Sequence, residues 1–277
     1  MPLVSIVSEL KKAQAEHYAV PLFVTFDMVA TEGLFATLEE KRSPAMIAIY
    51  AGWLERPSTR AFVALLRTLA QQATVPVSLM LDHGASFEQC AKALALGFTD
   101  LMFDGSQLPL AENIAQAQWV VRAAHAAGAG VEAELGHVGG GHEYQSYGAL
   151  GKGFTDPEVA GRFAAETGVD ILAVAVGSAH GVYQGEPRLD LRLLAEIRRR
   201  VDVPLSMHGG SGLAEEQFRA AIAGGIAKVN IFTDLGIRAG QTMAEAAGKP
   251  KASYFSILDA MRESFRQRSG YYVDLFG

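Results

Sequence analysis

Three of the seven histidines share one setting in the sequence. His83, His180 and His208 are each followed by a glycine, and each comes soon after a short apolar run. One such histidine alone is more often a hydrogen-bonded residue than a metal ligand, but three in the same setting favour a metal site. Imidazole nitrogen suits Zn²⁺, and three protein ligands leave one position open for a substrate. The sequence therefore predicts one divalent cation, with zinc as the expected ion.

A glycine-rich segment follows His208. Gly209, Gly210 and Ser211 stand directly before a segment with helical spacing, and Thr233 follows the next apolar run. Backbone N–H groups at the start of a helix bind anions, and barrel enzymes often hold phosphate between the seventh and eighth strands. Glycine also serves in tight turns, so the position of the run, more than its composition, favours a phosphate site.

Apolar runs of strand length alternate along the chain with longer segments of helical spacing, which is typical of βα units that build a parallel sheet. The expected strands are Val20–Phe26, Ala45–Tyr50, Val77–Leu81, Asp100–Phe103, Gly130–Leu135, Ile171–Val176, Leu205–Met207 and Lys228–Ile231. The expected helices are Thr31–Arg42, Ser58–Gln72, Ser86–Leu96, Ala111–Ala127, Pro157–Thr167, Leu191–Arg200, Ala214–Ala223 and Ser253–Arg268.

Eight strands that alternate with helices predict an α/β fold, a single (β/α)8 TIM barrel with extra helices at both ends. The length of 277 residues fits one domain over 1–277. A doubly wound sheet usually has a glycine-rich first turn, whereas the first expected strand runs into Asp27 and Met28 without a glycine. Since barrels carry their active sites at the C-terminal strand ends, the three histidines are expected to converge there.

Composition argues against several other classes of protein. The formal net charge is −6, from 24 basic and 30 acidic residues scattered along the chain, so no nucleic-acid partner is expected. The first apolar run, residues 1–7, is too short for a signal peptide or a membrane span. One cysteine, Cys90, cannot form an intramolecular disulfide, which fits a reducing setting. We therefore expect a cytoplasmic protein without a membrane partner.

Five segments in order along the chain resemble the class II ketose-bisphosphate aldolases. They are Leu-Asp-His at 81–83, Val-Glu-Ala-Glu-Leu-Gly at 131–136, Gly-Ser-Ala-His-Gly-Val-Tyr at 177–183, His-Gly-Gly-Ser-Gly at 208–212 and Lys-Val-Asn-Ile at 228–231. The resemblance implies reversible cleavage of a ketose 1-phosphate or 1,6-bisphosphate to dihydroxyacetone phosphate and an aldehyde. The expected partner is thus a small phosphorylated sugar.

The resemblance also implies roles for single residues. The metal ligands of the family match His83, His180 and His208. Asp82 matches the acid/base at the hydroxyl of the cleaved bond, and Asn230 matches the residue that holds the enediolate. Carboxylates beside a second, alternative metal position match Asp104 and Glu134. The cradle of the donor phosphate, where the family often also binds Na⁺ or K⁺, matches Gly181, Gly209, Ser211 and Thr233.

The catalytic base is expected in the loop after the fifth strand. There the glutamate of the family aligns with His142, and Glu143 is next to it. We expect Glu143 to act as the base at the enediolate carbon, with His142 as the competing candidate because its ordinary pKa of about 6.5 suits base work near neutral pH. Six glycines between 139 and 153 favour a mobile lid, with Gly139, Gly140 and Gly141 as its hinge.

A divalent cation suits this reaction on physical grounds. Cleaving a C–C bond beside a carbonyl leaves negative charge on oxygen, which a Lewis acid stabilises. A Schiff-base aldolase would instead need a buried lysine at the C-terminal end of a strand. Lys228 stands at the N-terminal end of its expected strand.

Several positions depart from the family pattern. Val24 stands where asparagine is usual, Tyr50 where serine is common, Phe232 where fructose-type members have aspartate, and Gln184 where many members have lysine. These positions lie on the substrate side, away from the metal and donor phosphate. We therefore expect an acceptor specificity that has diverged from fructose-bisphosphate aldolase.

Two other classes of function compete with this interpretation. Metal-dependent hydrolases on barrels usually open with paired histidines at the first strand, where this chain has Phe26 and Asp27, and a metal-dependent isomerase is a further alternative. A non-catalytic aldolase-like subunit is expected to lack the metal ligands.

The other histidines, His17, His125 and His137, are expected to be structural. The helical tail favours a homodimer or homotetramer.

Overall fold

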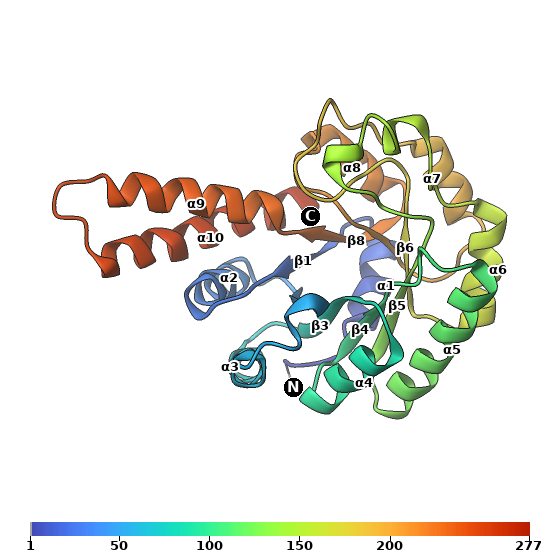
Figure 1. Cartoon of the computed structure of the whole chain (residues 1–277), viewed down its shortest axis with the longest axis horizontal. Helices are drawn as coiled ribbons and strands as arrows, with labels where there is room; N and C mark the ends of the chain where they lie inside the picture. The colour runs from blue at the N-terminus through green and yellow to red at the C-terminus, as the bar shows by residue number, and fades with distance from the viewer. Residues whose placement is uncertain (1) are drawn as a thin grey trace.

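The computed structural model describes residues 2–277 and shows a closed barrel of parallel strands in sequential order (Figure 1). Its strands are β1 (Val20–Val24), β2 (Ala45–Tyr50), β3 (Val77–Gly84), β4 (Asp100–Phe103), β5 (Gly130–Leu135), β6 (Ile171–Val174), β7 (Leu205–Met207) and β8 (Ile226–Ile231). The barrel closes where β1 pairs with β8, with Leu22 opposite Asn230. The predicted TIM barrel is confirmed.

A helix follows each strand, and the helices after β1 to β7 cover the outside of the barrel. The α-helices are α1 (Val7–Glu16), α2 (Met28–Lys41), α3 (Thr59–Gln72), α4 (Phe87–Leu96), α5 (Leu110–Ala126), α6 (Pro157–Thr167), α7 (Leu191–Arg198), α8 (Glu215–Ala223), α9 (Thr233–Ala247) and α10 (Tyr254–Phe276). Short 3₁₀ turns are η1 (Ala51–Trp53), η2 (Gly141–Glu143) and η3 (Gly148–Leu150). Ser86 and Asp156 cap α4 and α6 by accepting hydrogen bonds from backbone N–H groups.

Several boundaries differ from the prediction. β1 ends at Val24 instead of Phe26, β6 ends at Val174 instead of Val176, and several helix ends shift by a few residues. β3 continues through Asp82 and His83 to Gly84, since its pairing with β2 and β4 outlasts the apolar run. β8 starts at Ile226, and α10 runs on to Phe276. Hydrogen bonds between strands and tertiary packing extend a strand or helix beyond the residues whose hydrophobic pattern predicts it.

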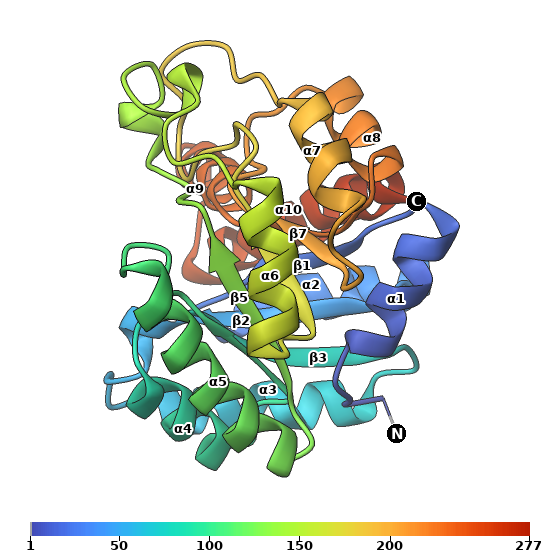
Figure 2. The same cartoon turned by 90° about the vertical axis from the view of Figure 1, so that its right-hand side faces the viewer.

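The core has two parts because successive strand residues point to opposite faces. Outward-facing side chains such as Phe23, Ile47 and Leu79 pack beneath the helices. A second cluster inside the barrel contains Leu22, Met46, Met80, Met102 and Ala173 together with Ile6, which precedes α1, and Leu10 and Ala13 of α1. Helix α1 thus packs against the interior of the barrel. It and the loop between β5 and α6 lie on opposite sides of the barrel in Figure 2.

Helices α9 and α10 form an arm, defined here as residues 233–276, that projects from the barrel (Figure 1). The two helices pack against each other, and α10 also packs against α2. Near the turn between them, Tyr254 and Phe255 are 71% and 74% exposed. Within residues 2–277, no helix combines the length and apolar character needed to cross a membrane.

Candidate active site

Polar side chains at the C-terminal strand ends surround a cavity of about 730 Å³. Strand alternation explains their direction, since Asp82 lies two residues beyond Met80 and Asp104 two beyond Met102, both of the inner cluster. Tyr50 and Asn230 likewise end β2 and β8 and line the same cavity. The arrangement matches the expectation that a barrel carries its chemistry at this end.

An irregularity in β3 brings two neighbouring residues to the cavity. The pairing of β3 with β4 shifts between Leu81 and Gly84, and His83 adopts a left-handed φ of 54°. Such a conformation is uncommon for a residue other than glycine and concentrates at functional sites. Its consequence here is that Asp82 and His83, which a regular strand would point to opposite faces, both line the cavity.

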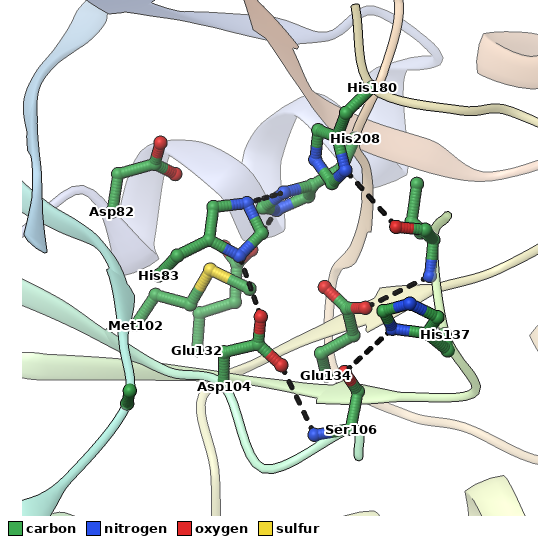
Figure 3. A network of polar contacts seen from close by, with 12 residues as sticks. Asp82, His83, Met102, Asp104, Ser106, Glu132, Glu134, His137, His180 and His208 are labelled. Carbon is green, nitrogen blue, oxygen red and sulfur yellow. Dashed lines mark hydrogen bonds and ion pairs between the residues drawn. The ribbon is translucent and has the colours of Figure 1, made fainter. Parts of the chain in front are cut away.

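The three histidines singled out in the sequence converge. Each offers a ring nitrogen, and these nitrogens lie within 4.8 Å of one another. Nδ1 of His208 is 3.1 Å from Nε2 of His83. Figure 3 shows the three rings facing a common point from the ends of β3, β6 and β7.

The other ring nitrogen of each histidine has its own partner. His83 Nδ1 is 2.8 Å from Asp104, His180 Nδ1 is 3.1 Å from the carbonyl oxygen of Val138, and His208 Nε2 is 2.7 Å from Glu132. Partners of this kind fix the ring orientation of metal-ligating histidines. Nε2 of His180 is buried and has no hydrogen-bond partner among the described residues. The donor set therefore fits a divalent cation.

Burial and neighbouring charges set the protonation of these groups. Burial holds the pKa of His180 down at about 4 and that of His208 well below its ordinary value. Burial also opposes protonation of His83, but the charge of Asp82 and the hydrogen bond to Asp104 outweigh it and raise its pKa to about 9. The field of the site thus favours positive charge beside Asp82 and Asp104.

A second group of possible ligands shares His83 with the first. His83, Asp104 and Glu134 also bring ligand atoms within 4.8 Å of one another. Burial, followed by the charge of Asp104, raises the pKa of Glu134 to about 8. One oxygen of Glu134 accepts a hydrogen bond from the backbone N–H of Val138 at 3.1 Å. The structure therefore brings the carboxylates predicted for an alternative metal position next to the histidines.

An ion pair lies beneath the histidines inside the barrel, where the sequence analysis assigned no functional residue. Lys228 and Glu132 are fully buried, and Nζ of Lys228 is 2.9 Å from one carboxylate oxygen and 3.1 Å from the other. Nζ also donates to Oδ1 of Asn230 at 2.6 Å, which leaves the amide nitrogen of Asn230 to donate to Asp82 at 3.1 Å. Lys228 and Glu132 thus orient Asn230 and His208. The signal available in the sequence was a charged residue of opposite sign inside each of two expected buried strands.

Four of the five residues predicted for phosphate lie in the cavity wall: Gly181, Gly209, Ser211 and Thr233. Gly209 has a φ of 68°, and a Cβ there would lie 2.3 Å from the carbonyl oxygen of Ala179, so only glycine fits. Gly210 does not line the cavity. A Cβ at Gly210 would face Ile231, Val229 and Phe218 in the core, so close packing accounts for that glycine.

The loop between β5 and α6 holds the two predicted base candidates away from the cavity. The side chains of His142 and Glu143 are 76% and 59% exposed, and they lie 4.0 Å apart. The stretch predicted as the hinge is tied down, because Gly141 donates to the carbonyl oxygen of His180, and His180 donates to that of Gly139. Figure 2 shows this loop rising beyond the end of β5.

The remaining histidines divide into two kinds. His125 pairs with Asp170 at 2.8 Å, and His17 ends α1 in the left-handed conformation, so both have the structural settings expected for them. His137 was assigned to the same group but lines the cavity, and its Nδ1 is 3.2 Å from the hydroxyl of Ser106. Its position directly after Gly136 and β5 was the signal available in the sequence.

Comparison with known proteins identifies the family. A model described as fructose-bisphosphate aldolase class-II matches residues 4–277, and the chain belongs to that family. The protein is therefore an enzyme, an aldolase, and aldolases are lyases. Enzymes of this family are generally metal-dependent, which agrees with the two groups of ligand atoms in the cavity.

Individual relatives support the same assignment. The chain is 38% identical over 254 residues to a probable fructose-bisphosphate aldolase of Bacillus subtilis, covering 90% of this chain and 88% of that protein. The crystal structure of the YdjI aldolase from Escherichia coli K12 superposes with a TM-score of 0.89 at 34% identity, covering 99% and 97%. That of a putative fructose-1,6-biphosphate aldolase from Coccidioides immitis gives 0.85 at 28% identity, covering 98% and 96%.

Proposed function

We propose that this enzyme uses one divalent cation, zinc, to cleave a ketose 1-phosphate or 1,6-bisphosphate reversibly into dihydroxyacetone phosphate and an aldehyde. The observation that carries the proposal is the convergence of His83, His180 and His208, each with one nitrogen held by a partner and the other turned to a common point. When bound, the cation supplies Lewis-acid stabilisation for negative charge on the substrate oxygens. Asp104 and Glu134 are its alternative ligands.

Asp82 is proposed as the acid/base at the substrate hydroxyl. Its carboxylate lies in the cavity wall next to the three imidazoles and accepts a hydrogen bond from Asn230. In the cleavage direction it takes the hydroxyl proton as the C–C bond breaks, and in synthesis it returns the proton. The amide of Asn230, held by Lys228, donates toward the oxygen on which charge develops.

Donor phosphate is proposed to bind in the cradle of Gly181, Gly209, Ser211 and Thr233. Thr233 is the first residue of α9, and the hydroxyl of Ser211 is 3.1 Å from the backbone nitrogen of Asp234 in the same first turn. The N-terminus of a helix favours an anion through its free N–H groups and its dipole. We place a Na⁺ or K⁺ ion at the same cradle as a counter-ion to the phosphate.

The base at the enediolate carbon is proposed to be Glu143, with His142 as the alternative. Both side chains are exposed in this structure, so the role requires the loop to close over the cavity. Tyr144 anchors the loop, because it is buried and its hydroxyl accepts a hydrogen bond from the backbone N–H of Arg188 at 2.8 Å. The backbone around η2 therefore changes conformation to bring the base to the cavity. The hydrogen bond from Gly141 to the carbonyl oxygen of His180 remains in place.

Assembly is proposed to use the arm. Tyr254 and Phe255 project from its end, where no other part of the described chain covers them, and such aromatic side chains usually mark a contact surface. We propose that residues 1–277 form one domain and that two or four copies associate through the arm in the cytoplasm.

Metal removal tests the central proposal. Chelation should abolish release of dihydroxyacetone phosphate from a panel of ketose phosphates, and Zn²⁺ or Co²⁺ should restore it. His208→Ala should lose both bound metal and activity, whereas the matched control His125→Ala, at the surface beside Asp170, should keep both. Full activity in protein shown by elemental analysis to be metal-free would refute the proposal. Activity as a hydrolase or isomerase on the same panel, without aldol cleavage, would favour the competing functions.

A further inference from the structure

The cavity has two sides that arise from different halves of the barrel. The proposed phosphate cradle follows β6, β7 and β8. The opposite wall follows β1 to β5 and includes Val24, Phe26, Tyr50, Ala85 and Leu108. Phe232, which follows β8 where that strand pairs with β1, completes this wall. With the donor phosphate in the cradle, the other end of the substrate lies against this second wall, named here the acceptor wall.

Aromatic rings dominate the part of the acceptor wall where β1 and β8 meet. The ring of Phe26 packs edge to face on Phe232, with centroids 4.9 Å apart, and against Trp53, with centroids 4.1 Å apart. Phe26 and Phe232 both line the cavity, and Val24 precedes them at the end of β1. Burial of apolar carbon against such a surface is favourable. A charged group would lose its hydration there without gaining a hydrogen-bond partner.

The acceptor wall is short of cationic side chains. No lysine or arginine lines the cavity in the part of the chain that the structure describes, whereas the carboxylates of Asp82 and Asp104 do. The neighbouring cation, Arg56, stacks its guanidinium on Trp53 at 3.4 Å from the ring centroid and is exposed. A phosphate dianion on this side would be desolvated near two carboxylates, with no lysine or arginine among the described residues of the wall to pair with it.

We infer that the acceptor aldehyde of this enzyme is uncharged and carries apolar carbon beyond its carbonyl group, so that the substrate has a single phosphate. The inference rests on the proposed aldolase function and specifies its substrate class. In synthesis, dihydroxyacetone phosphate loses a proton from its hydroxymethyl carbon. That carbon bonds to the carbonyl carbon of the aldehyde, whose oxygen takes up a proton. No other reactant is needed.

Two matched pairs of aldehydes test the inference with the metal-loaded enzyme and dihydroxyacetone phosphate. Glyceraldehyde and glyceraldehyde 3-phosphate differ by the phosphate alone, and kcat/KM should be at least about tenfold higher for the neutral member. Butanal and acetaldehyde differ by two methylene groups, and butanal should be favoured by about tenfold. Equal or better use of glyceraldehyde 3-phosphate, or no preference for butanal, would overturn the inference.

Variants test whether the acceptor wall causes the preference for butanal over acetaldehyde. Phe26→Ala should bring the butanal-to-acetaldehyde ratio of kcat/KM close to one, whereas Trp119→Ala, a control that removes an exposed aromatic side chain on α5, should keep the ratio of the unmodified enzyme. Arg56→Met should leave the use of glyceraldehyde 3-phosphate poor. If instead this aldehyde is the better substrate and loses its advantage in Arg56→Met, then Arg56 is its counter-ion and the inference is wrong.

A half-reaction separates this inference from the function on which it rests. Solvent deuterium exchange into dihydroxyacetone phosphate requires donor binding and proton abstraction but no aldehyde. Exchange together with a preference for the phosphorylated aldehyde would reject the acceptor inference alone. Absence of exchange in the metal-loaded enzyme would reject the proposed aldol chemistry and the acceptor inference with it.

Discussion

Replacing Lys228 by methionine gives a sharp test of the buried ion pair. Methionine keeps the length and most of the volume of the lysine stem, so little cavity is created. The change removes the ammonium group that lies within 3.1 Å of both oxygens of Glu132, and it removes the donors to Ser206 and Asn230. Glu132 remains 0% exposed, with His208 as its remaining close partner.

The structure sets the expected magnitude. Removing one member of a buried ion pair costs about 3–5 kcal/mol, because the remaining charge stays desolvated. The lost hydrogen bonds belong to the same ammonium group, so their cost is contained in that figure. For a domain of this size, about 4 kcal/mol corresponds to a fall in Tm of roughly 10 °C. The second variant, Lys228→Met combined with Glu132→Gln, removes the unpaired charge and should recover about half of the loss or more.

Urea unfolding measures both variants. The protein should be metal-free and at one fixed concentration, since metal binding and association both add to apparent stability. A coupling energy of at least about 1.5 kcal/mol between the two substitutions is expected. A loss below about 1 kcal/mol in Lys228→Met, or strictly additive effects in the double variant, would refute the argument that this pair is a desolvated, mutually dependent unit.

Three further predictions concern catalysis and assembly. Asp82→Asn should slow C–C cleavage by about 10²-fold or more while deuterium exchange into dihydroxyacetone phosphate survives; an equal fall in both, together with metal loss, would mean that Asp82 only supports the histidines. Glu143→Gln should abolish that exchange in metal-loaded enzyme, and His142→Gln should not; the opposite result would identify His142 as the base. Replacing Tyr254 and Phe255 together by serine should raise the dissociation constant of the assembly at least about tenfold, as measured by light scattering over a dilution series, since each ring contributes about 1.5–3 kcal/mol when buried. An unchanged mass over that series would place the interface elsewhere.

Most of the fold was predictable because buried parallel strands have a simple pattern. The run Ala45–Tyr50 was assigned to the residue, since hydrophobic burial on both faces leaves no polar position between its ends. Asp100–Phe103 was also assigned to the residue, although its first residue is a buried carboxylate. The end of β3 was not, because Asp82 and His83 break the apolar run while their backbones continue the ladder. The orientation of the arm could not be predicted from the sequence either, because it is set by packing between α10 and α2.

For the site, the positions of residues were easier to predict than the hydrogen bonds between them. Strand-end placement identified His83, His180 and His208 as neighbours, and the barrel brings them together. The same reasoning could not show that Lys228 reaches Asn230, because these two residues of β8, two positions apart on its inner face, meet only through the length of the lysine side chain. It also missed His137, whose loop geometry decides that it lines the cavity.

The docking of α1 against the barrel interior has a consequence for synthesis on the ribosome. Ile6 and Leu10 are completely buried in the finished protein, but their cluster includes Ala227, and the backbone N–H of Ile6 donates to Asp100. At roughly 5–20 residues per second, these apolar side chains wait roughly 10–45 s before Ala227 has been made. The apolar residues of the α1 segment are therefore made long before β8 and stay exposed during translation until β8 can pair with β1 and cover them.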